Sequence, residues 1–339
     1  MDSVATDNGD VGYSLANVEE LLLSCLDAAG VGSVLEVGAF RGDLTARLLD
    51  WAAGRGARVA AIDPSPEPEL IELHERHPEL ELIRETSQRA LAEVPLADAV
   101  IIDGDHNYYT LSEELRLLEE RAGSGLWPLV AFHDVGWPHG RRDAYHDPER
   151  IPEEHRQPLA HDVALAPGEP GVSRAGLHYE WVAAHEGGPR NGVLTAIEDF
   201  IAERPGLRLA VVPAFFGFGV LWSRDAPWDA ELARILDPWD RNPVIERLEA
   251  NRVAHLVDQR ELASLRARQA RMEGQLAELR GRVAEQTGLL KRMLDSRAFT
   301  VAEWLSRLNQ RGTPVFSRAA VRRALGRDGE RRSPSDEPG

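Results

Sequence analysis

The strongest constraint on the fold is a regular alternation of short, largely apolar runs with amphipathic segments in the first half of the chain. The apolar runs occupy residues 33–38, 57–63, 80–85, 97–103 and 128–134. In the segments between them, apolar residues recur at helical spacing. Short strands that alternate with helices predict βαβ units with right-handed crossovers, and therefore a parallel sheet covered by helices.

The alternation of helix and strand resumes later in the chain and ends with two neighbouring strands. Residues 191–206 predict a helix, and residues 207–213 and 217–224 predict two strands. Only three residues separate these strands, so we expect them to pair antiparallel. Residues 14–224 are therefore expected to form one α/β domain with a seven-stranded mixed sheet whose last strand is antiparallel.

The long segment 137–190 interrupts this rhythm and is rich in Pro, Gly, His and charged residues. A connection of this length inside a compact domain is usually a functional lid or a disordered insertion. Seven of the eleven histidines lie between residues 133 and 185. We interpret the segment as a polar, aromatic lid over a substrate, with His139 or His146 as a reserve base or metal ligand. A solvated loop that is merely rich in histidine is the alternative.

Residues 244–297 contain no Pro and only three Gly, and they carry a heptad pattern. Its apolar positions, at alternating three- and four-residue steps, are Leu262, Leu265, Met272, Leu276, Leu279, Val283, Leu290 and Met293. Gln269 and Gln286 occupy the two remaining positions. This pattern predicts a coiled coil that joins copies of the chain into a homo-oligomer. A long helix that folds back on its own domain is the alternative.

Composition assigns the remaining segments. We expect a flexible N-terminus over residues 1–13, a linker over 225–243, a short basic helical segment over 298–326 and a disordered tail over 327–339. The single cysteine, Cys25, excludes a disulfide framework and fits a reducing compartment. Since no signal peptide is evident at the N-terminus, we expect a cytoplasmic location.

The net charge of −17 is unevenly distributed along the chain. Residues 1–224 hold 20 more acidic than basic residues, whereas residues 225–339 hold 3 more basic than acidic ones. An acidic body of this kind repels nucleic acid and anionic membranes. No apolar run approaches the ~20 residues of a membrane-spanning helix. We therefore expect a small-molecule partner, with no nucleic-acid or membrane partner.

A glycine-containing turn, Glu36-Val37-Gly38-Ala39-Phe40-Arg41-Gly42, directly follows the first predicted strand and opens a helix. Glycines let a backbone approach a ligand closely, and open α/β sheets bind ligands at the carboxyl ends of their strands. Asp63 ends the second predicted strand, where an acidic side chain can bind both hydroxyls of a ribose. The dinucleotide fingerprint G-x-G-x-x-G is absent, which disfavours NAD.

This arrangement resembles motifs I and II of the class I S-adenosylmethionine-dependent methyltransferases over about residues 14–224. The resemblance implies a Rossmann-like fold and S-adenosylmethionine as the cofactor. The cofactor-binding residues that it implies are Glu36, Gly38 and Gly42 around the methionine part, Asp63 at the ribose, and Ser87 and Gln88 near the adenine.

A second set of polar residues follows the fourth and fifth predicted strands: Asp103 and His106 after one, His133 and Asp134 after the other. Neighbouring parallel strands end at the same edge of a sheet, so we expect these side chains to converge. The set resembles the metal site of cation-dependent O-methyltransferases of the catechol, caffeoyl-CoA and macrocin types. Asp103 and Asp134 match that site, whereas His133 replaces a carboxylate. Mg²⁺ prefers oxygen ligands, and imidazole suits Mn²⁺, Fe²⁺ or Zn²⁺.

In that family a bound cation would orient the substrate hydroxyl and lower its pKa, and a base would take the proton. The catechol-type enzymes place a lysine three residues after the metal-binding aspartate, where this chain has His106. The only lysine, Lys291, lies in the predicted coiled coil, so His106 is the candidate base, with Asp103 as a metal ligand in the catalytic pair. A purely structural role, in which Asp105 and His106 cap the next helix, is the alternative.

The sequence therefore predicts a methyltransferase that methylates a hydroxyl on a sugar or a natural-product-like small molecule, with S-adenosylmethionine and a divalent cation such as Mg²⁺ or Mn²⁺. Three alternatives remain open. The enzyme could work without a metal, or it could be a hydroxylase similar to cephalosporin hydroxylase, with iron at His133 and Asp134. It could also be a non-catalytic adaptor that binds the cofactor and assembles through its coiled coil.

Overall fold

A computed structural model of the chain describes residues 13–309, 319 and 321–323. These residues fall into two units, Met1–Glu261 and Leu262–Gly339. The main sheet consists of β1 (Ser33–Val37), β2 (Arg58–Ile62), β3 (Glu81–Ile83), β4 (Ala99–Ile102), β5 (Leu129–Phe132), β8 (Leu207–Val212) and β9 (Phe218–Ser223). The helices of the first unit, besides the short turn η1 (Leu15–Val18), are α1 (Glu19–Ala29), α2 (Asp43–Ala53), α3 (Pro68–Arg76), α4 (Ser87–Glu93), α5 (Tyr108–Ala122), α6 (Val193–Ala202) and α7 (Asp229–Leu236).

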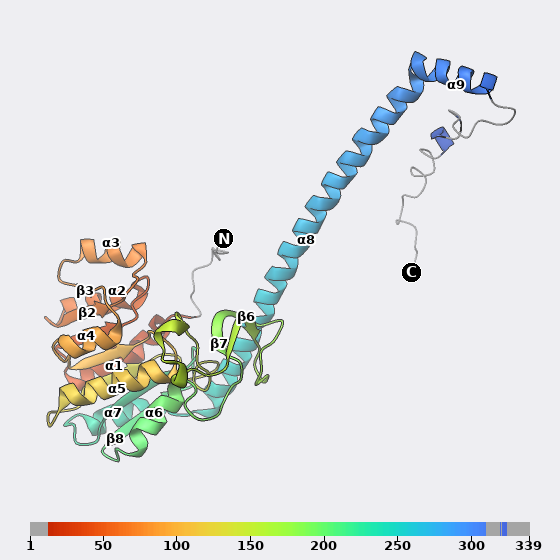
Figure 1. Cartoon of the computed structure of the whole chain (residues 1–339). Helices are drawn as coiled ribbons and strands as arrows, with labels where there is room; N and C mark the ends of the chain where they lie inside the picture. Colours follow the sequence, from red (N-terminus) through yellow and green to blue (C-terminus); the bar gives the residue numbers. More distant parts are fainter. Residues whose placement is uncertain (1–12, 310–318, 320, 324–339) are drawn as a thin grey trace. The chain divides into compact units, whose positions relative to one another are not determined.

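The seven strands lie in the order β3-β2-β1-β4-β5-β9-β8. Strands β1 to β5 are parallel, and β9 runs antiparallel to both of its neighbours, β5 and β8. The predicted fold class is thereby confirmed: a seven-stranded mixed sheet with an antiparallel end (Figure 1). The order reverses between β1 and β4, so their carboxyl ends flank the crevice where open α/β sheets bind ligands.

Helices cover both faces of the sheet because the strands are apolar on both sides. Val34, Ile101 and Ala131 face a core shared with α1, α2, α3 and α7. Leu35 and Phe132 face the opposite core, shared with α4, α5 and α6. Strands buried on both faces read as continuous apolar runs, which explains why the sequence located them well.

The chain between β9 and α8 departs from the prediction of a linker. Residues 229–236 form helix α7, and its Leu232 and Leu236 are completely buried in the core with α1. The Trp222 indole donates a hydrogen bond to Asp229, which fixes the start of the helix. This part of the predicted linker is therefore an integral element of the α/β unit.

The insertion over residues 137–190 is folded. It contains the short helical turns η2 (Pro148–Arg150) and η3 (Glu153–His155) and an antiparallel hairpin of β6 (Leu159–Leu165) and β7 (Leu177–Ala183). Asp143 anchors it, because this buried carboxylate accepts hydrogen bonds from the backbone N–H groups of Tyr108 and Gly192 and from the Tyr145 hydroxyl. The insertion is therefore ordered, and its role as a lid stays a prediction.

The C-terminal part consists of α8 (Pro243–Asp295) and α9 (Arg297–Asn309). The first turns of α8 belong to the first unit, where Val253 packs against Phe216 and Leu177. Part of the predicted basic segment 298–326 lies in α9. The rest of that segment lies largely outside the described residues, as do the whole predicted tail 327–339 and residues 1–12 of the predicted N-terminus 1–13. Among the described helices, none combines the length and hydrophobicity that crossing a bilayer would require.

Candidate functional site

The turn between β1 and α2 brings backbone against backbone at the carboxyl edge of the sheet. Gly38 has φ +84°, and a Cβ atom there would lie 2.2 Å from the carbonyl oxygen of Asp103. Gly42, also at φ +84°, is the N-cap of α2. Both positions therefore require glycine, and the turn holds β1 and the residues after β4 in direct contact.

Asp63 lies at the end of β2 and is held in a fixed orientation. Its Oδ2 accepts a 2.8 Å hydrogen bond from the Phe40 N–H, and its Oδ1 accepts one of 2.8 Å from the Ser65 N–H. The side chain is 8% exposed. Each carboxylate oxygen keeps a lone pair, so the group is positioned to accept two further hydrogen bonds from a neighbouring diol.

Glu36 is buried in β1, beneath the glycine turn. Its carboxyl group accepts a 2.6 Å hydrogen bond from the Thr45 hydroxyl. Burial raises the pKa of Glu36 to about 8, helped by the negative charges of Asp103 and Asp63, although the Thr45 hydrogen bond opposes the shift. A ligand with positive charge next to this carboxyl would favour its ionised form.

Ser87 and Gln88 form the first turn of α4, after β3. The Ser87 hydroxyl lies beside Glu114 of α5, a buried carboxyl whose pKa is raised to about 8 by burial. The two predicted adenine neighbours thus lie at the same edge of the sheet as Asp63. Neither residue lines the pocket described below, nor do Glu36, Gly38, Gly42 and Asp63.

Beyond the ends of β4 and β5, two imidazole rings face two carboxylates. His133 Nδ1 lies 3.1 Å from Asp103 Oδ1 and 3.5 Å from Asp134 Oδ2. His106 Nε2 lies 3.2 Å from Asp134 Oδ2 and 3.5 Å from Asp103 Oδ1. These four side chains therefore converge, as predicted. Asp134 adopts φ +58°, an uncommon backbone conformation of the kind that is often found at functional sites.

The charges of this group are strongly interdependent. Burial lowers the pKa of His133, but Asp103 and Asp134 raise it by more, and it lies well above its usual range. The pKa of His106 is raised in the same way, mainly by Asp134, against the effect of burial. Burial would raise the pKa of Asp103, yet the two histidines hold it well below its usual value. Two carboxylates this close require positive charge between them.

Three of these four residues fit a divalent cation. Atoms of Asp103, His133 and Asp134 lie within 4.8 Å of one another, close enough to share an ion. His133 Nε2 is 2.8 Å from the Phe215 carbonyl oxygen, a contact that leaves Nδ1 directed at the carboxylates. His106 Nε2 is buried and forms no hydrogen bond within the described residues, despite its two carboxylate neighbours. This set of nitrogen and oxygen donors suits Mn²⁺, Fe²⁺ or Zn²⁺ better than Mg²⁺.

A pocket of about 420 Å³ opens directly on these residues. Its walls include Asp103, His106, His133 and Asp134 and, from the insertion, His139, Tyr145, His146, Tyr179 and Trp181. The pocket is also lined by Tyr13, Ala144, Leu177, His178, Glu180, Phe216 and Arg260. The volume is in the range of small-molecule sites. The predicted lid thus borders the site.

Sequence reasoning did not single out Tyr13, Phe216 or Arg260. Tyr13 stacks on Phe216, with ring centroids 5.0 Å apart, and the Arg260 guanidinium lies 4.9 Å from the Tyr13 ring centroid. These residues come from the start of the domain, the β8–β9 connection and α8. A pattern based on strand ends contains no signal for them.

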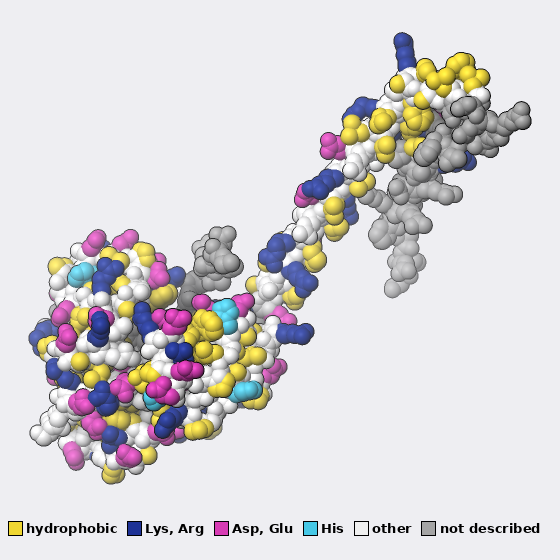
Figure 2. Space-filling model, in the orientation of Figure 1, with side chains coloured by type: hydrophobic (Ala, Val, Ile, Leu, Met, Phe, Trp, Pro, Cys, Tyr) yellow, Lys and Arg dark blue, Asp and Glu magenta, His cyan; other side chains and the backbone are white. Residues whose placement is uncertain are grey.

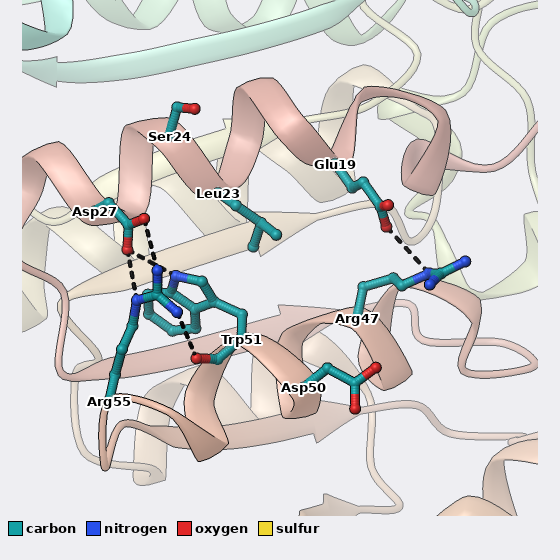
Figure 3. A pocket seen from close by; sticks show the side chains of 8 residues that line it. All are labelled: Glu19, Leu23, Ser24, Asp27, Arg47, Asp50, Trp51 and Arg55. Carbon is teal, nitrogen blue, oxygen red and sulfur yellow. Dashed lines mark hydrogen bonds and ion pairs between the residues drawn. The ribbon is translucent and has the colours of Figure 1, made fainter.

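A second hollow lies between α1 and α2 and has a different character (Figure 3). Arg55 binds the Asp27 carboxylate through two hydrogen bonds of 2.7 and 2.8 Å, and the Trp51 indole donates a third. Arg47 forms an ion pair of 3.1 Å with Glu19. Because its main charges neutralise one another, this hollow is not a candidate for catalysis.

Comparison with known proteins gives one match in sequence. Residues 35–135 match the family model of a methyltransferase domain. No curated protein matches the chain by sequence. The matched segment contains the glycine turn, Asp63 and the four residues after β4 and β5.

Several solved structures are similar at low sequence identity. The SAH-bound methyltransferase PaMTH1 of Podospora anserina is 14% identical, with a TM-score of 0.37 over 61% of this chain and 78% of that one. A Staphylococcus aureus protein described as a caffeoyl-CoA O-methyltransferase is 11% identical, with a TM-score of 0.36 over 60% and 81%. NcsB1, an O-methyltransferase from neocarzinostatin biosynthesis, is 15% identical, with a TM-score of 0.35 over 62% and 55%.

The assignment depends on the family match and not on these distant neighbours. The match covers β1 to β5 almost completely, within the predicted seven-stranded mixed sheet. It also contains the turn at Gly38 and Gly42 and the acidic residue that ends β2. Residues 35–135 of the chain therefore carry a methyltransferase domain.

Proposed function

We propose that this methyltransferase methylates a hydroxyl group of a polar small molecule, with a divalent cation at Asp103, His133 and Asp134 and with His106 as the base. The observation that carries the proposal is the arrangement after β4 and β5, where two imidazole nitrogens face two carboxylates at 3.1–3.5 Å on the wall of a pocket. A sugar or a natural-product-like compound suits a pocket lined by histidine and aromatic side chains.

The cofactor site proposed next to this pocket uses the residues around the glycine turn. Asp63 would accept hydrogen bonds from the two ribose hydroxyls, in the orientation that the Phe40 and Ser65 N–H groups already impose. Glu36, Gly38 and Gly42 would surround the methionine part, and Ser87 and Gln88 would lie near the adenine. Gly38 contacts the backbone of Asp103 and Gly104, so a methyl donor bound here would lie beside the cation-binding residues.

His106 has the position that a base requires. Its ring borders the pocket, with Nε2 3.2 Å from Asp134 Oδ2 and 3.5 Å from Asp103 Oδ1. These carboxylates raise the pKa of His106, and a cation bound to them would oppose that effect, so that the neutral ring would accept a proton from a hydroxyl in the pocket. Asp103 and Asp134 would hold the ring in place. When bound, the cation would orient the acceptor hydroxyl and lower its pKa. Hydrogen-bonding side chains such as Tyr145 and His146 would orient the remainder of the acceptor.

The test is methyl transfer after removal of metal ions. The protein, treated with EDTA and dialysed, is incubated with S-adenosylmethionine and a panel of glycosides and phenols, and S-adenosylhomocysteine formation is measured. We expect turnover to disappear and to return with Mn²⁺ or Mg²⁺. Asp134→Asn should lose the metal response, while His178→Asn, a change in an exposed histidine paired with Asp162, should keep it.

Each contrary result would select a different function. Turnover that survives EDTA would indicate a metal-independent methyltransferase. Oxygen consumption without S-adenosylhomocysteine formation would indicate a hydroxylase. Calorimetric binding of S-adenosylmethionine without turnover on any acceptor would indicate a non-catalytic adaptor.

We also propose that copies of the chain associate through the second part of α8. All eight apolar heptad positions from Leu262 to Met293 are exposed, between 44% and 62%. Figure 2 shows hydrophobic side chains along the helix. A helix with this stripe gains stability in water mainly by packing the stripe against another surface, and a second copy offers a matching one. Leu276→Asp should reduce the molar mass measured by light scattering to that of a monomer, while Gln275→Asp, next to the stripe, should not. A wild-type monomer would refute this proposal.

A further inference from the structure

A second set of metal-binding side chains lies next to the four residues discussed above. Ring nitrogens of His106 and His139 and a carboxylate oxygen of Asp134 all lie within 4.8 Å of one another. This set shares Asp134 with the first one, but it contains two imidazoles and one carboxylate. It joins the turn after β5 to the insertion, because His139 lies beyond Asp134 in the first residues of the segment 137–190.

One ring nitrogen of His139 is buried without a hydrogen-bond partner in the described part of the chain. The side chain is 4% exposed, and its Nδ1 finds no hydrogen-bond partner within the described residues. An unsatisfied buried polar atom destabilises a fold and is rare, and such an atom is available to a ligand.

The neighbours of His139 fix the ring beside the other two ligands. It stacks on His106, with ring centroids 5.1 Å apart, and meets Tyr179 of β7 edge-on at the same centroid distance. The His139 carbonyl accepts a 2.8 Å hydrogen bond from the Val193 N–H, at the start of α6. The ligand set is therefore held by packed elements, as a metal site requires.

The chemistry of the set indicates the kind of ion. Two imidazoles and one carboxylate leave positions open for water or substrate, and this combination binds first-row ions such as Fe²⁺, Co²⁺ and Zn²⁺. Mg²⁺ would bind this set weakly, because hard ions prefer oxygen donors. Two dications bound at these two positions would share Asp134, lie close together and repel each other strongly. We therefore expect only one of the two positions to be occupied at a time.

We propose that His106, Asp134 and His139 form a distinct binding position for a borderline divalent ion of the Fe²⁺, Co²⁺ or Zn²⁺ class. This position goes beyond the proposed function, which uses the oxygen-rich position at Asp103, His133 and Asp134. An ion held by His106 occupies the lone pair that would accept the proton of the acceptor. The identity of the bound metal would therefore decide whether the base is available.

The experiment uses Co²⁺ as a probe, because its visible spectrum reports the number and type of its ligands. Apo-protein is titrated with Co²⁺, and the affinity and the spectrum are measured without S-adenosylmethionine or acceptor. Wild type should bind one Co²⁺ per chain. His139→Asn should weaken Co²⁺ binding at least about 100-fold, since loss of an outer-shell partner alone costs 10–100-fold. Its affinity for Mn²⁺, which favours the oxygen-rich position, should stay within about twofold.

A replacement ligand tests the geometry directly. In His139→Cys the thiolate should reach the ion and add a sulfur-to-cobalt charge-transfer band, even if the affinity falls. His178→Asn, at another pocket histidine, should leave Co²⁺ affinity and spectrum unchanged. The proposal is wrong if Co²⁺ affinity and spectrum are the same in wild type and His139→Asn, or if His139→Cys folds and shows no such band. Because no readout involves methyl transfer, failure of the proposed function would leave this result unaffected.

Discussion

The two hollows of the α/β unit both contain titratable side chains, but these side chains are paired in one hollow and incompletely hydrogen-bonded in the other. Between α1 and α2, carboxylates and guanidinium groups neutralise each other in direct pairs such as Asp27 with Arg55 (Figure 3). After β4 and β5, the imidazole and carboxylate groups are close but incompletely bonded, and His106 Nε2 and His139 Nδ1 have no hydrogen-bond partner in the described part of the chain. Charged groups that satisfy one another stabilise a surface, whereas groups that remain unsatisfied are available to a ligand.

This comparison also predicts which mutations should affect stability and which should affect binding and catalysis. Changes in the pocket after β4 and β5 should alter binding and catalysis more than stability. Changes between α1 and α2 should alter stability slightly and catalysis not at all. The following variants test that division, beginning with the largest expected effect.

His106→Ala should lower the turnover number about 10²–10⁴-fold, the usual contribution of a general base. Affinity for S-adenosylmethionine should change little, because the ring lies on the pocket wall and not at the glycine turn. Turnover is measured with saturating cofactor and metal, and calorimetry gives the affinity. His185→Ala, a change in an exposed histidine that does not line the pocket, serves as the control. A nearly normal rate in His106→Ala would remove this residue from the mechanism.

Asp63→Ala should weaken S-adenosylmethionine binding by about 1–3 kcal/mol, because two charge-assisted hydrogen bonds to the ribose would be lost. Asp63→Asn keeps the size of the side chain and should give a smaller loss. Since Asp63 also accepts hydrogen bonds from the Phe40 and Ser65 N–H groups, thermal unfolding must be measured in parallel. Unchanged calorimetric affinity in a folded Asp63→Ala protein would contradict the proposed cofactor position.

Glu36 should make cofactor affinity dependent on pH. Its pKa of about 8 means that the carboxyl is mostly protonated at pH 7, whereas the sulfonium and ammonium groups of the cofactor favour the ionised form. Affinity should therefore rise severalfold, at most about tenfold, per pH unit up to pH 8 and level off above it. The ratio of wild-type to Glu36→Gln affinity cancels the titration of the cofactor itself. A ratio that stays constant from pH 6 to pH 9 would show that Glu36 does not face the cofactor.

The sequence predicted the sheet and the meeting of Asp103, His106, His133 and Asp134 for the same physical reason. Buried parallel strands are continuous apolar runs, and residues that follow neighbouring strands end up at the same edge. Local sequence therefore carried enough information for this part of the site. The predicted roles of these residues as ligands and base remain predictions.

The contribution of the insertion could not be predicted in the same way. His139 approaches His106 because the insertion follows a path set by long-range bonds, such as those of Asp143 with the N–H groups of Tyr108 and Gly192. Arg142 is buried and donates hydrogen bonds to the carbonyl groups of Ala183 and Pro170. Neither contact leaves a periodic pattern in the sequence. The alternation of apolar and polar residues in β6 and β7 is short and lies among Pro and Gly residues, so the sequence did not predict the hairpin.

Asp27→Asn, between α1 and α2, should have the smallest effect. Burial raises the pKa of Asp27, but the hydrogen bonds from Arg55 and Trp51 and the charge of Arg55 together lower it by more, and it lies below its ordinary value of 3.8. Such a carboxylate stabilises the folded state above pH 3.8, and the contribution is lost as the pH falls below that value. Because the pair is exposed, Asp27→Asn should lower the free energy of unfolding at pH 7 by no more than about 1 kcal/mol. Denaturant unfolding at pH 7 and pH 3 should show this difference shrinking towards zero in acid, with turnover at pH 7 unchanged. A large loss of turnover in a folded Asp27→Asn protein would mean that this hollow also takes part in function, and the division between the two hollows would fail.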